Sequence, residues 1–333
     1  LTRAKKEVAL SYAREGYQGR EQLPSQFLEE IDRNLTIAGD AAHYEKSFLK
    51  EKNILFARSA LIKPGVKDKE LLNELFKKYG LSVTALNNYL ACPWRYFYLN
   101  LLRIPEAPNK HLAYGNAVHG ALRNFFDFWA AGEDRGSNFL VQQFERGLEK
   151  QPISEGDYKE ALEKGETALK GYYKKYHRSW IRTIKNEFRI DGIEILSGIR
   201  LNGTIDRLEI LDGRGNVNVI DYKTGKPKSR KELEGSTRNA DGNYKRQLIF
   251  YNLLLNHFAN GQYQVKEGII DFIEPDAKGM YKREVFIIQP AEIEQLKEQL
   301  KKVAQEILDL KFWDQKCDEK DCPYCALRKV MKA

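Results

Sequence analysis

The sequence predicts an α/β fold in which helices flank a central mixed β-sheet, with a helical extension at the N-terminus. Up to about residue 180 the apolar residues follow a helical period, and a run of strand-like segments then begins. Helices and strands alternate from there to the C-terminus. An order of helices, strand meander, helix, strands and helix is typical of helices packed on a mixed sheet.

The helices are expected where apolar residues recur at intervals of three or four. Residues 38–80 are charged and are predicted to be a linker with helical pieces. Ser82 precedes the next helix, which Pro93 should stop or restart because proline cannot continue a helix. Further helices are predicted at residues 113–131, 137–149, 157–178, 243–258 and 290–310.

The strands are expected between glycine-rich turns in the middle of the chain. Gly192, Gly203 and the segment 212–215 are predicted to be the turns that separate the first four strands. The predicted strands are residues 185–191, 194–201, 203–211 and 217–222, followed by 264–274 and 281–288.

Length and composition narrow the class of protein. A chain of 333 residues indicates two units, or one elaborated domain with a flank. Lys and Arg exceed Asp and Glu by 55 − 47 = +8, which favours a polyanionic partner.

No apolar run approaches 18 residues, so we expect no transmembrane helix, and the first residues lack the apolar core of a secretory signal. Because the chain starts at Leu1, we expect it to begin inside a longer protein.

Two acids and a lysine form the sharpest candidate site. Asp221 and Lys223 lie two residues apart, so on a strand their side chains project from the same face. A hairpin through residues 212–215 can place Asp206 on the neighbouring strand. Two carboxylates can hold a hard cation such as Mg²⁺, which polarises a phosphate and lowers the pKa of a bound water. With a lysine nearby to orient that water, this grouping suits metal-assisted phosphodiester cleavage.

A plainer interpretation of the same residues is open at this point. Asp206 with Arg207, and Asp221 with Lys223, can equally be ion pairs on the surface of an exposed hairpin, because Asp-x-Lys is a common combination. The surroundings of these residues, rather than their spacing, decide between the two interpretations.

Four sequence elements occur in an order that resembles the PD-(D/E)XK nuclease superfamily in its RecB-like branch. Residues 203–207, Gly-Thr-Ile-Asp-Arg, are similar to its G-x-I/V-D-R element, and residues 221–225, Asp-Tyr-Lys-Thr-Gly, to its D-Y/F-K-T-G element. Residues 115–119 resemble its G-x-x-x-H helix, and residues 247–251 its Q-x-x-x-Y element. The resemblance spans roughly residues 82–333 and implies a restriction-endonuclease-like fold.

The resemblance implies a set of metal ligands. A histidine on an apolar helix face is usually a core residue, but His119 belongs to a matching element, and neutral imidazole is a competent ligand. We expect the bound cation to be Mg²⁺ or Mn²⁺. The implied ligands are His119, Asp206, Asp221 and the backbone carbonyl of Tyr222.

The resemblance also assigns catalytic roles to three side chains beside the acids. Lys223 would position the attacking water. Gln247 and Tyr251, four residues apart on one face of a helix, would contact the substrate phosphate or position Lys223. An ordinary amphipathic helix with a polar corner is the alternative for that pair.

The four cysteines are too few and too clustered for a disulfide scaffold. Cys317, Cys322 and Cys325 lie within nine residues, and Cys92 lies far upstream. Such clustering indicates metal ligation or redox chemistry in a reducing compartment, which favours a cytoplasmic location. The resemblance implies a 4Fe-4S cluster on these thiols, although Met331 replaces the usual last cysteine and Cys317 would supply the fourth thiolate. Zinc, or no metal, is the alternative.

The start of the chain resembles the end of a UvrD/Rep-like superfamily 1 helicase motor. The first twelve residues are similar to its last motif, in which Arg3 would contact the γ-phosphate of ATP. The sequence lacks the Walker A pattern G-x-x-x-x-G-K-S/T, so this chain alone is not expected to hydrolyse ATP. We therefore expect a motor remnant at 1–37, a helical linker at 38–80 and a nuclease domain at 81–333.

Together these patterns predict the deoxyribonuclease domain of a helicase–nuclease that acts in DNA repair or recombination. Its expected substrate is single-stranded DNA, its expected partner is the rest of the motor, and no membrane association is expected. The alternative is a catalytically inactive DNA-binding module that keeps the fold and a structural iron–sulfur or zinc site. The presence of all four sequence elements disfavours that alternative.

Overall fold

The computed structural model describes residue 10, residues 31–37, 39 and 41, and residues 67–332 apart from 107–108, 197 and 239. The chain divides into two units, Leu1–Gly65 and Val66–Ala333. A 3₁₀ turn at Arg33–Leu35 is the regular structure described in the first unit. The motor motif around Arg3 and the helical pieces expected before residue 67 lie outside the described residues.

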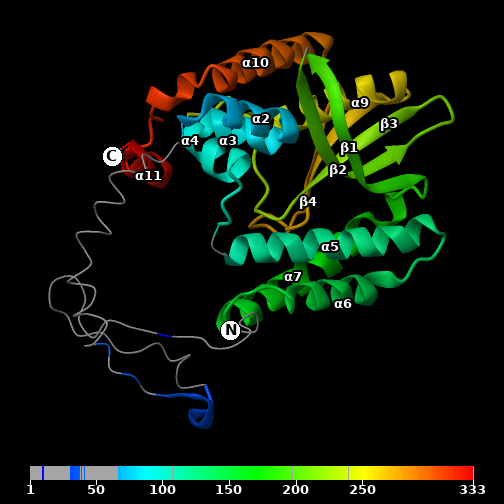
Figure 1. Ribbon diagram of the computed structural model, residues 1–333. Coiled ribbons are helices and arrows are strands. Elements are labelled where there is room, and N and C mark those ends of the chain that lie inside the picture. Colours follow the sequence, from blue (N-terminus) through cyan, green and yellow to red (C-terminus); the bar gives the residue numbers. More distant parts are fainter. Residues whose placement is uncertain are drawn as a thin grey trace. The chain divides into compact units, whose positions relative to one another are not determined.

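In the described part of the chain, five strands form one mixed sheet in the order β1-β2-β3-β4-β5 (Figure 1). Strands β3 and β4 are parallel, and the other neighbouring pairs are antiparallel. The predicted α/β fold with a mixed sheet is confirmed. The strands are β1 (Ile184–Leu196), β2 (Ile199–Ile210), β3 (Asn216–Lys223), β4 (Gln264–Phe272) and β5 (Arg283–Phe286).

The parallel pair requires a crossover, because strands that run the same way cannot be joined by a hairpin. After β3 the chain forms the short α8 (Arg230–Leu233) and then α9 (Asn243–His257), which packs on the sheet and leads to β4. This crossover brings Gln247 of α9 into hydrogen-bond contact with Lys223 at the end of β3.

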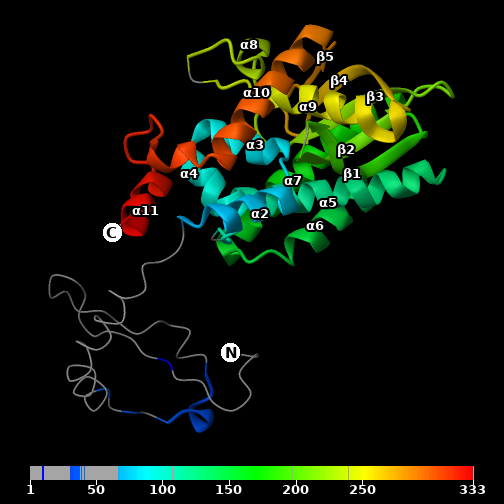
Figure 2. The same ribbon diagram turned by 45° about the horizontal axis from the view of Figure 1, so that its top comes forward.

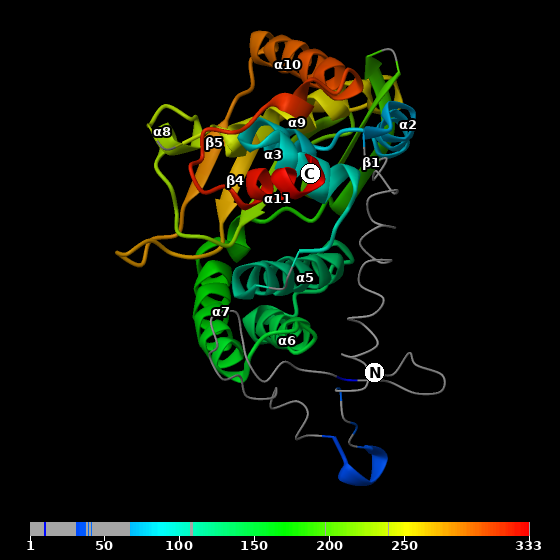
Figure 3. The same ribbon diagram turned by 60° about the vertical axis from the view of Figure 1, so that its left-hand side comes forward.

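Helices cover both faces of the sheet (Figure 1 and Figure 3). Two clusters of buried apolar side chains fill the spaces between the three layers, one on each face. No helix among the described residues is both long and apolar enough to cross a membrane. One face carries α2 (Lys69–Tyr79), α3 (Val83–Ala91), α4 (Pro93–Tyr96), α9 and α10 (Pro290–Leu308), and the other carries α5 (Lys110–Ala130), α6 (Gly136–Leu148) and α7 (Glu155–Tyr176).

The C-terminal segment returns to the beginning of the second unit. The last helix, α11 (Pro323–Lys332), packs beside α4 (Figure 2). Trp94 Nε1 donates a hydrogen bond to the carbonyl of Gln315 at 3.1 Å, and the Tyr89 hydroxyl donates to Glu306 at 2.9 Å. Segments more than 200 residues apart in sequence are thus joined directly.

Pro93 restarts a helix as predicted. Helix α3 ends at Ala91, Cys92 is extended, and Pro93 takes the first position of α4, where its missing N–H costs no hydrogen bond. The chain then continues as a π-helix over Phe97–Leu101. This break places the buried Cys92 between two helices.

The predicted turns at Gly192 and Gly203 are wrong, because both glycines lie inside long strands. Strand β1 continues through Gly192 with a bulge, marked by a register shift and a φ of +68°. The β1–β2 hairpin turns at Gly198 instead, with a φ of +77°. A Cβ at Gly203 would come within 2.7 Å of Leu254 Cδ1, so this glycine allows α9 to approach the sheet.

Gly165 allows α6 and α7 to pack closely. It is buried in α7, and a Cβ at this position would lie 2.3 Å from ring atoms of Phe144 in α6. We expect Gly165→Ala to lower the free energy of unfolding by about 1–3 kcal/mol, because the ring must move. Urea unfolding followed by circular dichroism measures this change.

Gly156 in the same helix provides the matched control. Nothing lies within 4 Å of a Cβ there, and alanine has a higher helix propensity than glycine. Gly156→Ala should therefore leave the free energy of unfolding unchanged or raise it by up to ~1 kcal/mol. Equal losses in the two variants would contradict the packing argument.

Candidate active site

The candidate site lies where β2 and β3 separate. Their pairing ends at Arg207 and Ile220, so Asp206 and Asp221 are the first residues beyond the last pair. Asp206 Oδ2 accepts a hydrogen bond of 2.7 Å from the backbone N–H of Tyr222, which takes the place of a strand carbonyl. The two acids are thereby held side by side where the strands part.

The acids do not form surface ion pairs. Arg207 is 1% exposed, lies 4.3 Å from the ring centroid of Phe126 and pairs with Glu209 at 3.0 Å, rather than with Asp206. Asp221 is also 1% exposed. The interpretation of these residues as an exposed, charged hairpin is therefore wrong.

Helix α5 brings His119 to the same place. Its Nδ1 atom lies 3.4 Å from Asp206 Oδ1, and its ring meets the Tyr222 ring edge-on at 6.0 Å. Burial disfavours the charged imidazolium, but the hydrogen bond to Asp206 and the charge of that residue outweigh burial, so the pKa of His119 is raised. The ring is thus held against the acids.

Glu187 completes a group of possible metal ligands that sequence patterns alone did not reveal. It lies on β1 directly across the antiparallel pair from Asp206, and donor atoms of His119, Glu187 and Asp206 lie within 4.8 Å of one another. Burial and then the charge of Asp206 raise the pKa of Glu187. Its φ of +46° falls in the left-handed region, which is rare in a strand and indicates local strain. The sequence could have indicated Glu187 only through a prediction of how β1 pairs with β2, because that register places Glu187 opposite Asp206.

A hydrogen-bonded chain links β3 to α9. Lys223 Nζ lies 2.6 Å from Asp221 Oδ2 and donates a hydrogen bond to Gln247 Oε1 at 2.9 Å. Gln247 Nε2 donates in turn to the Tyr251 hydroxyl at 2.8 Å. Gln247 therefore holds the lysine ammonium, and Tyr251 holds the amide of Gln247.

Burial and the mutual charge interaction act in opposite directions on the pKa values of Asp221 and Lys223. Burial raises the pKa of Asp221 to about 6, although the charge of Lys223 opposes the rise. Burial alone would lower the pKa of Lys223, but Asp221 outweighs it and the pKa of Lys223 is raised. The lysine is therefore a cation at neutral pH.

The donor set fits a divalent cation. Asp221 Oδ2 is buried and, apart from its ion pair with Lys223, has no hydrogen-bond partner among the described residues. Carboxylate oxygens are the ligands that Mg²⁺ and Mn²⁺ prefer, and the imidazole of His119 suits Mn²⁺ better than Mg²⁺. The backbone carbonyl of Tyr222 as a further ligand stays a prediction.

A cleft of about 230 Å³ opens next to Lys223. Thr224 and Gly225, which follow Lys223, line it together with α5 and α7. Both lysines in its lining are paired with acids: Lys110 Nζ lies 3.0 Å from Glu160, and Lys164 Nζ lies 2.8 Å from Glu274. The helical residues in the lining are Lys110, His111, Tyr114, Asp157, Glu160, Ala161 and Lys164.

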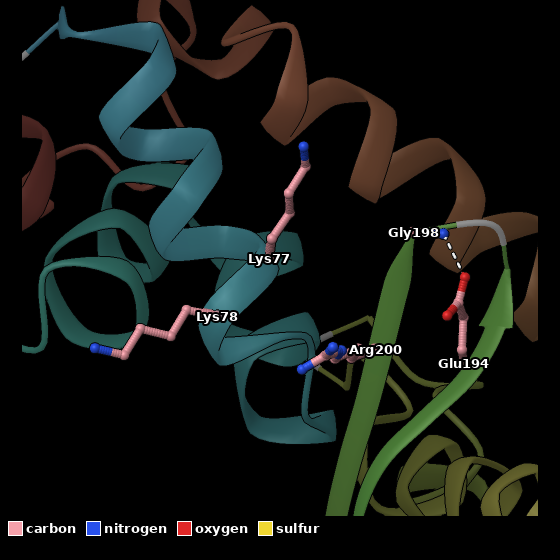
Figure 4. Close-up of a pocket in the computed structure, with 5 residues that line it drawn as sticks. All are labelled: Lys77, Lys78, Glu194, Gly198 and Arg200. Carbon is pink, nitrogen blue, oxygen red and sulfur yellow. Dashed lines mark hydrogen bonds between the residues drawn. The ribbon is translucent and has the colours of Figure 1, made fainter.

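A separate hollow of about 380 Å³ lies beside the β1–β2 hairpin (Figure 4). Its basic side chains do not converge, because Lys77 and Lys78 point in different directions. Glu194 in its lining accepts a hydrogen bond from the Gly198 N–H at 2.8 Å. Arg200 of this hollow precedes Asp206 by six residues on β2, about 20 Å along the strand, so the hollow is not part of the acid site.

The four cysteines gather between α4 and α11. Cys92 Sγ lies 3.7 Å from the sulfur atoms of Cys322 and Cys325, and Cys317 Sγ lies 3.6 Å from that of Cys325. All four sulfur atoms lie within 4.8 Å of one another, and all four residues are free thiols. This group can therefore hold a metal ion.

Comparison with known families identifies the class of protein. A sequence model of the PD-(D/E)XK nuclease superfamily matches residues 80–330. The chain therefore belongs to the PD-(D/E)XK nuclease superfamily, and its mixed sheet flanked by helices is consistent with the restriction-endonuclease-like fold. A comparison with curated proteins finds no match.

Solved structures show only distant similarity. A protein of Eubacterium rectale described as a candidate exonuclease is 11% identical with a TM-score of 0.47, covering 77% of this chain and 90% of that one. A structure named SSO0001 is 14% identical with a TM-score of 0.28, covering 65% of this chain and 83% of that one. Neither similarity adds to the family assignment.

Metal affinity at this site should fall on acidification. A protonated carboxyl group or an imidazolium ring cannot bind a cation, the pKa of Asp221 is about 6 and that of His119 is raised. We expect Mn²⁺ affinity to be highest above pH 7 and to fall at least ~10-fold between pH 7 and pH 5. Isothermal titration calorimetry measures this, and an affinity independent of pH would contradict the assignment of these ligands.

Glu187 should contribute directly to metal binding. We expect Glu187→Gln to weaken Mn²⁺ binding by at least ~10-fold, because one carboxylate of the group is lost. Asp191→Asn is the matched control, since Asp191 lies on the same strand with its side chain 56% exposed and paired with Arg189. Unchanged affinity in Glu187→Gln would remove this residue from the site.

Proposed function

We propose that this protein is a metal-dependent nuclease that hydrolyses the phosphodiester bonds of DNA. Membership of the nuclease superfamily supports hydrolysis in general. A bound Mg²⁺ or Mn²⁺ ion would polarise the scissile phosphate and lower the pKa of the attacking water. The observation that carries the proposal is the meeting, where β2 and β3 part, of His119, Glu187, Asp206, Asp221 and Lys223.

Each side chain of the site has a separate role in this proposal. Asp206 and Asp221 hold the cation, and Asp206 is itself oriented by the backbone of Tyr222. Lys223, kept charged by Asp221, orients the attacking water and offsets negative charge at the phosphate. Gln247 and Tyr251 act as positioning residues, because they hold the lysine through consecutive hydrogen bonds.

We propose single-stranded DNA as the substrate. A cleft of about 230 Å³ opens beside Lys223, where a single strand would reach the proposed metal site. Lys110 and Lys164 in its lining have side chains that are 43% and 47% exposed, so both can meet a phosphate backbone. The net charge of +8 supports a polyanionic substrate.

We further propose that the chain is the nuclease part of a helicase–nuclease that acts in DNA repair or recombination. The support is the resemblance of residues 1–37 to the end of a helicase motor, with Arg3 in its last motif. In this arrangement residues 38–80 link the motor to a nuclease domain at 81–333, and the rest of the motor supplies ATP hydrolysis. A cytoplasmic location fits four cysteines that form no disulfide and are grouped closely enough to hold a metal ion.

One observation favours a second function, that of a DNA-binding module without catalysis. Lys223 already offsets the buried charge of Asp221 through an ion pair of 2.6 Å, and such a pair can be purely structural. Incubation with labelled single-stranded DNA and Mn²⁺, with and without EDTA, separates the two functions. Products that form only without EDTA support the nuclease, whereas binding without products supports the module.

Lys223 is the most direct test of catalysis. We expect Lys223→Met to lower the rate of DNA cleavage by at least ~100-fold while Mn²⁺ still binds, because the lysine acts on water and phosphate rather than on the cation. Lys226→Met is the matched control, since this exposed lysine lies three residues later and outside the chain of contacts to Gln247. Cleavage by Lys223→Met at the rate of the control would overturn the mechanism.

A further inference from the structure

The distances between the cysteine sulfur atoms match ligands that share a single metal ion. The edge of a tetrahedron is about 1.63 times the distance from its centre to a corner, so zinc–sulfur bonds of about 2.3 Å place two thiolates about 3.8 Å apart. Three contacts of 3.6–3.7 Å join the sulfur atoms, from Cys322 to Cys92, from Cys92 to Cys325 and from Cys325 to Cys317. This spacing suits one tetrahedral ion at the centre of the group.

The same spacing does not suit the 4Fe-4S cluster that the RecB-like resemblance implies. In such a cluster each thiolate binds a different iron atom, and the four iron–sulfur bonds point outward from the corners of a cube. The thiolates must then lie much farther apart than thiolates that share one ion. Because all four sulfur atoms here lie within 4.8 Å of one another, four iron atoms and four sulfides do not fit between them.

We propose that Cys92, Cys317, Cys322 and Cys325 bind one Zn²⁺ ion, in place of an iron–sulfur cluster. Four thiolates are a common ligand set of structural zinc, and they leave no position open for water or substrate. The site therefore supports the fold and takes no part in hydrolysis. This inference does not depend on the proposed nuclease activity.

The position of Cys317 in the fold accounts for the departure from the iron–sulfur spacing at residue 331. Met331 stands where the resemblance expects a cysteine, and it follows Cys325 by six residues on α11, about 9 Å along the helix axis. Cys317, in the loop before α11, instead lies in contact with Cys325.

The surroundings of the thiols suit an anionic metal site. Zinc with four thiolates carries a net charge of −2, and backbone N–H groups of Arg95 and Glu319 hydrogen-bond to the sulfur atoms of Cys92 and Cys317. The Tyr98 hydroxyl, buried near Cys92, has no hydrogen-bond partner among the described residues and is a donor available to a thiolate. These donors stabilise thiolate charge without adding a metal ligand.

Metal analysis and X-ray absorption of the whole chain test the proposal. We expect colourless protein with one zinc ion per chain, four sulfur neighbours at about 2.3 Å and no metal–metal scattering. Cys92→Ser and Cys317→Ser should each lose the zinc and lower the melting temperature by at least ~5 °C, because the two ends of the unit are no longer tied. Met331→Leu, the matched control, should keep both the zinc and the melting temperature.

Two outcomes would overturn the zinc site. Brown protein that contains iron and acid-labile sulfide after anaerobic purification would establish the cluster instead. Metal-free protein whose melting temperature is unchanged in Cys92→Ser would show that the thiols bind nothing. Asp206→Ala should retain zinc while losing Mn²⁺, so failure of the zinc proposal and failure of the nuclease proposal are distinguishable.

Discussion

The hydrogen bond from the backbone of Tyr222 to Asp206 is the contact on which the site depends. Where two strands separate, a backbone N–H loses its carbonyl partner, and burial makes an unpaired donor costly. A carboxylate satisfies this donor, so Asp206 must face the gap between the strands. Its other oxygen is then left for His119, and Glu187 lies across from it. A requirement of backbone hydrogen bonding thus orients an acid of the proposed metal site.

Buried charged residues on the opposite face of the sheet from Asp206 fix the register of its strands. Arg207 and Asp271 are at most 1% exposed, and Asp271 accepts hydrogen bonds from the Tyr172 hydroxyl at 2.5 Å and from Arg283 Nε at 2.8 Å. Removing one member would leave a buried charge without its partner, which is strongly destabilising. Because Arg207 follows Asp206 directly, a slip of one residue would exchange the acid with a buried arginine that lies over the Phe126 and Tyr222 rings. The buried arginine therefore holds the acid in place.

The sequence predicted which acids and lysine lie together better than it predicted the turns around them. The spacing of Asp221 and Lys223 was sufficient to place both on one face, because strand periodicity is a local property. Glu187 was not identifiable in the same way, since its position depends on how β1 pairs with β2. Gly203 was mistaken for a turn because a glycine in a turn and one beneath a packed helix have the same sequence signature; the difference is the contact with α9. Local patterns predicted which side chains share a face, whereas tertiary pairing determined the exceptions.

The position of Cys92 ahead of every strand has a mechanical consequence. The chain enters the second unit through α2 and α3, and Cys92 follows before the sheet begins. Tyr89 and Trp94 bond to the C-terminal segment beside it. Tension applied between the two ends of this unit would therefore pass through the contact between α4 and α11, and the strands would carry little of the load. The acids where β2 and β3 separate would then keep their geometry under such a force.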